Sequence, residues 1–346
     1  MKTRIVVLGA ALLACTPGLM LAAADPEVLL KQDIDRREQE RREQRWDERH
    51  VPGGAPVLAP SPPVAASGPC FPVRRISVHP GDLLPTSRVA ALRAAYEGRC
   101  LGAADLAAVQ HSLNSLALDA GLVTTRVVVP EQNLASGELR LEVWPGILEA
   151  QEAPALSARE LALASPLRPG DLLQLRALEQ AVDNLNRLAS LRSTIDLKPG
   201  EQPGGSVALL TVQRARPWQA ALAWQGAALN GEETHTVRAS ATADSPLRLA
   251  DRLVLGVNGN LQDGQVDDSH GGSLDYDLPV GWWRLSAGSD RYDYRNEVQA
   301  GLTTFAATGK SRAFRLEAAR LLHRDATTRW TLALHGKRRL NDNFIA

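Results

Sequence analysis

Apolar and polar positions predict a small α+β unit over residues 70–146. Residues Phe71–Val78 alternate between apolar and polar side chains, as a half-buried strand does. The next segment predicts a helix that ends at Tyr96. A second helix has apolar residues at helical spacing, namely Leu106, Val109, Leu113 and Leu116. Two strands, Val123–Val129 and Glu138–Trp144, complete the unit.

The same order of elements recurs over residues 147–216. A short strand at Ile147–Glu152 precedes a short helix that begins at Ser157. The longer helix Leu172–Leu188 keeps its apolar residues on one face. Two strands follow it, at Leu191–Leu197 and Ser206–Gln213. The pattern therefore predicts two tandem copies of one module, with a period of about 75 residues.

Long alternating strands begin after Pro217. Trp218, Leu222 and Trp224 alternate with small or polar residues, and the same alternation returns near Leu255 and Leu332. One apolar face, one wet face and aromatic residues near strand ends are typical of a membrane β-barrel wall. The alternative is a soluble sandwich, which would bring more Val, Ile and Phe to a shared core. Residues 217–346 leave room for about six to eight spanning strands.

The first residues predict export. Lys2 and Arg4 precede the apolar run Ile5–Leu13, and the small residues Ala22–Ala24 supply a cleavage site. We therefore expect a secretory signal peptide over residues 1–24. Alternatively, the sequence around Cys15 loosely resembles a lipoprotein processing box, which would place a lipid on that cysteine.

Two polar segments separate the signal peptide from the folded modules. Residues 25–49 are densely charged, with opposite charges four residues apart such as Asp33 and Arg37. This favours a polar helix that is either solvated and frayed or a movable plug for a polar cavity. Residues 50–69 are rich in proline and glycine and predict an extended linker.

Net charge and cysteine content narrow the choice of partners and of cellular compartment. Lysine plus arginine equals aspartate plus glutamate at 39 each, so no net charge favours a nucleic-acid partner. Once the signal peptide is removed, Cys70 and Cys100 are the remaining cysteines. An even pair in an oxidising compartment predicts one disulfide, although two buried free thiols are the alternative.

No residue pattern predicts catalysis. The seven histidines are scattered without zinc-ligand spacing, and no nucleophile elbow, phosphate loop or dinucleotide fingerprint occurs. We expect neither an enzyme nor a bound cofactor or metal. The acid-rich stretch Asp263–Asp277 predicts a polar hairpin loop at the membrane surface rather than a calcium site.

Several ordered motifs resemble one known family. The first module carries four such motifs, namely Cys70–Ile76, Tyr96–Gly102, Gly121–Gly137 and Glu142–Gly146. They look like the first polypeptide-transport-associated (POTRA) domain of two-partner secretion transporters, which export haemolysins and filamentous adhesins. Leu178–Leu188 and Ile195–Gly200 resemble the second POTRA domain, and Asp277–Trp283 resembles an early strand of the barrel. The implied fold class is tandem α+β POTRA domains, at 70–146 and 147–216, followed by an antiparallel transmembrane β-barrel from residue 217.

The resemblance implies an outer-membrane transporter with periplasmic N-terminal domains and no bond chemistry. The POTRA pair would capture an unfolded secreted exoprotein by adding an extended segment to a strand edge beside a helix. The barrel would then contact outer-membrane lipid and pass the chain outward. We expect substrate contact at Arg126, Gln132, Thr124 and Val128; the alternative is that charge there only protects an edge strand from aggregation.

The sequence departs from the family at its end. Family members close a barrel of about sixteen strands and carry an inward loop tipped by Val-Arg-Gly, a motif that does not occur in this sequence. We therefore expect a transporter cut short within its barrel. The alternative functions are an outer-membrane protein assembly factor of the same superfamily and a truncated remnant that binds without transporting.

Overall fold

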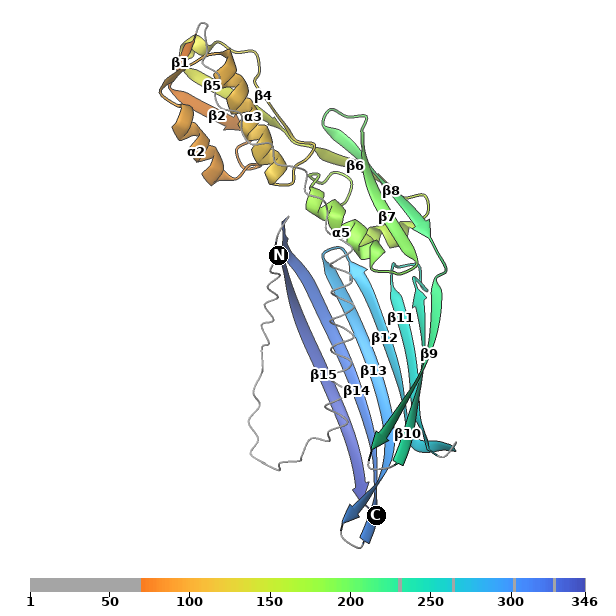
Figure 1. Cartoon of the computed structure of the whole chain (residues 1–346). Helices are drawn as coiled ribbons and strands as arrows, with labels where there is room; N and C mark the ends of the chain where they lie inside the picture. Colours follow the sequence, from red (N-terminus) through yellow and green to blue (C-terminus); the bar gives the residue numbers. More distant parts are fainter. Residues whose placement is uncertain (1–69, 230–231, 263–264, 301–302, 326–327, 346) are drawn as a thin grey trace. The chain divides into compact units, whose positions relative to one another are not determined.

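The computed structural model describes residues 70–345 apart from 230–231, 263–264, 301–302 and 326–327. The predicted signal peptide, charged helix and linker, together with Cys15, lie outside the described residues. The described elements form two α+β modules and one large sheet (Figure 1). No described helix is long and apolar enough to cross a membrane.

The first module packs two helices against a small sheet of order β2-β5-β4. Strand β2 is parallel to β5, and β4 is antiparallel to it. Its elements are β1 (Phe71–Val73), β2 (Arg75–His79), α2 (Thr86–Tyr96), β3 (Arg99–Leu101), α3 (Ala103–Asp119), β4 (Arg126–Val128), the 3-10 turn η1 (Leu134–Ser136) and β5 (Glu138–Trp144). Alternate residues of β5 and one stripe of α3 form the core, namely Leu139, Leu141, Val143, Val109, Leu113 and Ala117.

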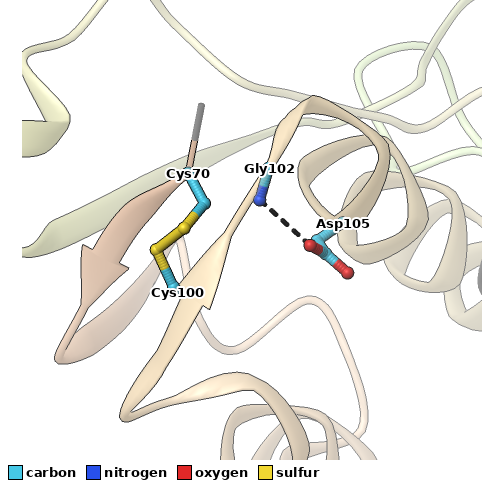
Figure 2. The surroundings of a disulfide bond; sticks show 4 residues. All are labelled: Cys70, Cys100, Gly102 and Asp105. Atoms are coloured by element: carbon cyan, nitrogen blue, oxygen red, sulfur yellow. Dashed lines mark hydrogen bonds between the residues drawn. A yellow bond between two sulfur atoms is a disulfide. The ribbon is translucent and has the colours of Figure 1, made fainter. Parts of the chain in front are cut away.

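A disulfide joins the start of the first module to β3, as Figure 2 shows. Cys70 directly precedes β1, and Cys100 lies in β3 opposite Pro72. Their Cα atoms are 5.3 Å apart. The predicted disulfide is therefore confirmed, and the alternative of two free thiols is wrong. Beside it, Asp105 accepts a hydrogen bond of 3.0 Å from the Gly102 N–H and so fixes the start of α3.

The second module repeats this arrangement with sheet order β6-β8-β7, in which β6 is parallel and β7 antiparallel to β8. Its elements are β6 (Ile147–Glu152), α4 (Ala158–Ala164), α5 (Leu175–Asn186), β7 (Leu191–Pro199) and β8 (Gly205–Arg214). Helix α5 begins three residues later than predicted. Leu172 forms a bridge with Ile147, and the Leu173 N–H donates to the Gly146 carbonyl, so both residues are extended.

Seven antiparallel strands lie side by side in chain order in the large sheet (Figure 1). They are β9 (Trp218–Leu229), β10 (Glu232–Asp244), β11 (Arg252–Gln262), β12 (Gln265–Val280), β13 (Trp283–Ala300), β14 (Thr303–Arg324) and β15 (Arg329–Ile345). The number falls within the predicted range. The acid-rich stretch is not a surface loop, because residues 265–277 belong to β12.

The two faces of this sheet differ in polarity. One face exposes large apolar side chains, including Leu222, Trp224, Leu255, Val257, Leu274, Leu285 and Leu316. The other face carries ion pairs: the Arg315 guanidinium bonds to Asp275 at 2.8 Å and also contacts Asp290. Asp275 fits within β12 because its side chain lies on this polar face and pairs with Arg315. The alternation predicted for a barrel wall is thus present across neighbouring strands.

Candidate functional site

The candidate site is the outer edge of β4, where three of the four predicted contact residues lie in or beside the strand. Val127 turns its N–H and carbonyl away from β5, and side chains of α3 bind both groups. Its N–H donates to Asn114 Oδ1 at 2.9 Å. Its carbonyl oxygen accepts from Gln110 Nε2 at 2.9 Å and from Asn114 Nδ2 at 3.3 Å. The edge beside the helix is therefore closed at this residue.

Gln132 closes the sheet just beyond the end of β4. Its Nε2 donates to the Arg140 carbonyl at 2.8 Å, and its Oε1 accepts from the Arg140 N–H at the same distance. The side chain thus continues the β4–β5 ladder by one step. Gln132 is one of the predicted contact residues, but in this state its amide is bonded within the protein.

The other predicted residues differ in accessibility. Arg126 is exposed, and its guanidinium lies 3.2 Å from the Val123 carbonyl and 3.1 Å from that of Thr125. Val128 is half-buried and pairs with Glu142 of β5. Thr124 is half-buried and lies before β4, with a buried hydroxyl that has no hydrogen-bond partner among the described residues. Arg126 is therefore the predicted residue whose side chain is most available to a ligand.

Trp144 was not predicted to belong to this site. It lies opposite Arg126 in the β4–β5 ladder, is 54 % exposed, and donates from Nε1 to Glu142 at 3.3 Å. The period-two alternation of Glu138–Trp144 contained the signal, because it places Arg140, Glu142 and Trp144 together on the outer face. A large exposed aromatic residue beside an arginine is typical of recognition surfaces.

Hydrogen bonds connect the second module to two turns of the large sheet. Asn184 of α5 donates to the carbonyl oxygens of Ala164 and Gly281, both at 2.8 Å. The Gly281 N–H donates in return to the Leu163 carbonyl at 2.8 Å. Trp282, the next residue, packs against the apolar core of the module. The turn between β12 and β13 is therefore held by the module on both its polar and its apolar sides.

A buried arginine and acidic residues hold the other turn, between β10 and β11. Arg187 donates to the Ala250 carbonyl at 2.5 Å and pairs with Asp277. Burial, with help from the nearby Arg284 and Arg252, lowers the pKa of Arg187 to about 10. The guanidinium remains charged at neutral pH, and Asp244 accepts from the Ser190 N–H at 2.9 Å. No group of three or more metal-ligating side chains occurs in the described residues.

Comparison with known proteins gives the same division of the chain. Residues 71–146 match the ShlB-type POTRA domain and residues 146–199 match a second POTRA domain. Residues 204–346 match the haemolysin secretion/activation protein family ShlB/FhaC/HecB. In this order of domains the chain is similar to two-partner secretion transporters. Its two modules are tandem POTRA domains, and its large sheet is consistent with part of a barrel.

Curated proteins similar to this chain carry consistent names. The outer membrane transporter CdiB-2 of Burkholderia pseudomallei is 28% identical, covering 96% of this chain and 60% of its own length. CdiB of Dickeya dadantii is 27% identical over 81% of this chain and 50% of its own length. The haemolysin transporter ShlB of Serratia marcescens is 29% identical, covering 77% of this chain and 47% of its own length. The chain therefore spans about half to three fifths of the length of these relatives.

The solved structure of CdiB from Escherichia coli has the same fold, with a TM-score of 0.82 and 24% identity over 94% of this chain and 61% of that one. The structure of CdiB from Acinetobacter baumannii gives a TM-score of 0.75 at 22% identity. The match covers 92% of this chain and 63% of that one. This chain is an outer-membrane protein whose POTRA domains lie in the periplasm.

Proposed function

We propose that this chain is the exporter component of a two-partner system, which receives an unfolded secreted protein in the periplasm and passes it through the outer membrane. The observation that carries the proposal is the continuity of the molecule. Two POTRA domains lead directly into antiparallel barrel strands, and the second domain is hydrogen-bonded to two barrel turns. The POTRA domain that follows the proposed binding site is thereby fixed to the turns of a membrane-spanning wall.

The mechanism requires binding and guidance rather than catalysis. An unfolded chain presents regular backbone N–H and carbonyl groups, which a strand edge can pair with whatever the side-chain sequence. Side chains then supply selectivity. Arg126 and Trp144 lie on the outer face of the first POTRA sheet, where they would contact residues of the exoprotein beside the paired segment.

Gln132, Thr124 and Val128 contribute to the same proposed contact through the strand they border. Val128 pairs with Glu142 of β5, Thr124 lies just before β4, and Gln132 bonds to Arg140 just beyond the end of the strand. In this proposal Arg126 contacts the exoprotein directly, and the other three residues shape the edge. Outer-membrane lipid is the second partner, facing the exposed apolar side chains of the barrel strands.

The test begins with a gene for a large, repeat-rich secreted protein beside the gene for this chain. A reporter made from its N-terminal region is expressed with the chain in a bacterial host that lacks two-partner transporters. We expect the reporter to be recovered from the medium, and Arg126→Ala to lower that yield severalfold. Reporter that stays in the periplasm with the wild-type chain present would contradict the proposal.

A matched control separates recognition from general damage. Arg88→Ala changes an exposed arginine of α2 in the first POTRA domain, outside the proposed contact at β4. We expect it to leave reporter yield unchanged. If both substitutions lower the yield equally, the loss would reflect general damage rather than a role for Arg126.

A further inference from the structure

The amide of Asn114 occupies the position that a neighbouring strand would take. A carboxamide offers one carbonyl and one N–H donor pair, as a peptide group does. Asn114 uses them to bond the N–H and carbonyl of a single strand residue, Val127, at 2.9 and 3.3 Å. A residue of an added antiparallel strand would make the same pair of bonds.

The second POTRA domain has the same contact at the corresponding edge. Ser193 lies in β7, which borders its sheet as β4 borders the first. Its N–H donates to Asn186 Oδ1 at 2.6 Å, and Asn186 Nδ2 donates to its carbonyl at 3.1 Å. Asn186 ends the helix that precedes this strand, and Asn114 lies in the helix that precedes β4. Two domains of different sequence thus close the same edge with the same side chain.

An edge closed in this way has a physical advantage. Unpaired N–H and carbonyl groups on an edge strand invite pairing with any passing chain, including another copy of the protein. A bonded amide satisfies these groups while no guest is present. The Asn114 side chain is half-buried, and its Nδ2 also donates to the Gln110 carbonyl of its own helix at 3.0 Å. A rotation of this side chain would release Val127 without unfolding the domain.

We propose that Asn114 is an edge latch, which closes β4 until an extended segment of polypeptide displaces it, and that Asn186 does the same for β7. This inference rests on the proposed function only in taking the exoprotein as the natural guest. The guest's peptide groups replace the bonds between each amide and the N–H and carbonyl of its strand residue, so these two backbone groups stay paired. The net gain per residue is small, which suits a site that must release the chain to the barrel.

The experiment uses the full chain in detergent micelles and a fluorescein-labelled peptide of alternating threonine and valine. Binding is followed by fluorescence anisotropy. Asn114→Leu keeps the size of the side chain but removes the amide, so the guest has nothing to displace. We expect the variant to bind the peptide about tenfold more tightly than the wild-type chain does, and the Val127 amide to exchange faster with solvent in the absence of peptide.

Two controls address side effects of the substitution. His111→Leu adds the same apolar residue to an exposed position of the same helix, and its affinity should equal that of the wild type. Gln110→Leu removes one donor to the Val127 carbonyl and should tighten binding in the same direction but less. This second variant also tests the latch if Asn114→Leu fails to fold.

Equal peptide affinity for Asn114→Leu, Gln110→Leu and the wild type would overturn the latch. So would equally tight binding of a peptide N-methylated at alternate residues, because that peptide cannot pair with a strand edge. The export assay reports separately on the proposed function. A wild-type chain that fails to export its reporter would overturn that function, whereas a tighter complex with Asn114→Leu would still support the latch.

Discussion

Glu160 is a single buried side chain that ties together the second POTRA domain and a barrel turn. It is 1% exposed and accepts from the Ser157 N–H at 2.8 Å, from the Ser245 hydroxyl at 2.7 Å and from the Arg214 guanidinium at 2.9 Å. Ser245 belongs to the turn between β10 and β11. Burial alone would raise the pKa of Glu160, but the hydrogen bonds from these three residues outweigh it and hold the pKa below 4.5.

Glu160 should make stability depend on pH. In the unfolded chain a glutamate has a pKa of about 4.3. Because the folded pKa is lower, its stabilisation is fully present above that pH and is lost as pH falls through the folded pKa. Glu160→Gln should lower the free energy of unfolding by about 1–3 kcal/mol at pH 7 and flatten its dependence at acid pH. Urea denaturation followed by tryptophan fluorescence measures both effects.

Glu152→Gln is the matched control for that substitution. Glu152 is an exposed glutamate at the end of β6, in the same domain. We expect its replacement to change stability little at any pH. Identical pH profiles for Glu160→Gln and the wild type would show that the buried carboxylate does not stabilise the contact between the second POTRA domain and the β10–β11 turn.

The disulfide gives a second prediction at the residue scale. Cys70 and Cys100 are 30 residues apart, and closing a loop of that length restricts the unfolded chain. Replacing both with serine should lower the stability of the first POTRA domain by about 3 to 4 kcal/mol in the chain-entropy model. Chemical denaturation of the oxidised protein and of the double variant measures the difference. Unchanged stability on replacement would contradict the assigned role.

Residue-scale predictability depended on the kind of interaction. The disulfide could be predicted, because an exported chain with an even cysteine pair leaves few alternatives. The hydrogen bonds of Gln132 and Asn114 could not be predicted from the sequence. Gln132 bonds to a backbone group 8 residues away, and Asn114 bonds to one 13 residues away. Both hydrogen bonds depend on how a helix or turn packs beside a strand. Sequence spacing marked Gln132 as polar and near an edge, without showing what it binds.

At the scale of elements, the contact between α5 and the β12–β13 turn determines how the second POTRA domain is attached to the barrel strands. Asn184 is 7% exposed and bonds two carbonyls that belong to different elements. Gly281, which receives one of these bonds, has φ of +58°, and a Cβ there would lie 3.2 Å from Pro166. The turn therefore needs glycine both for its backbone conformation and for its close approach to the domain.

Asn184→Leu should loosen this attachment. The substitution keeps the size of the side chain but removes the donor to the buried Ala164 carbonyl and to the half-buried Gly281 carbonyl, at a cost of about 1–3 kcal/mol. We expect faster hydrogen exchange at the Gly281 amide, with little change at Val127 in the first domain. Gln213→Leu, at an exposed position of β8, is the control. Unaltered exchange at Gly281 would show that the turn is held by other contacts.

The order of elements was predictable, and their limits were less so. Helical spacing and turn residues identified both copies of the module. The start of α5 shifted because Leu172 and Leu173 form backbone bonds with Ile147 and Gly146, which no local pattern reports. The acid-rich strand β12 was mistaken for a loop for a related reason. Aspartates oppose strand formation in general, but here they face arginines across a polar wall.

At the scale of the whole molecule, the two faces of the barrel sheet should respond differently to charge. Leu274 and Ser273 are adjacent in β12 and point to opposite faces, with Leu274 46% exposed among apolar neighbours. Ser273 lies opposite Asp290 on the polar face. Leu274→Arg should destabilise the membrane-inserted state by up to about 2–4 kcal/mol, depending on depth, whereas Ser273→Arg should be tolerated.

Folding into lipid vesicles, followed by heat-modifiable mobility on gels, measures that difference. Equal folding yields for the two variants would contradict the assignment of the faces. The overall architecture was predictable from the alternation of apolar residues and from the family motifs. The pairing of particular residues across strands was not, because the register of neighbouring strands depends on turns and bulges such as the shift between Gly259 and Leu261.

The most direct test of the proposed export function is to ask which face of the barrel strands the exoprotein touches. A photo-crosslinking amino acid is placed at Asn258, on the polar face of β11, or at the adjacent Val257, which is 60% exposed on the apolar face. The full chain is expressed with its exoprotein and irradiated during secretion. We predict an exoprotein adduct from position 258 and none from position 257. No adduct from 258, or equal adducts from both positions, would contradict passage of the exoprotein along this wall.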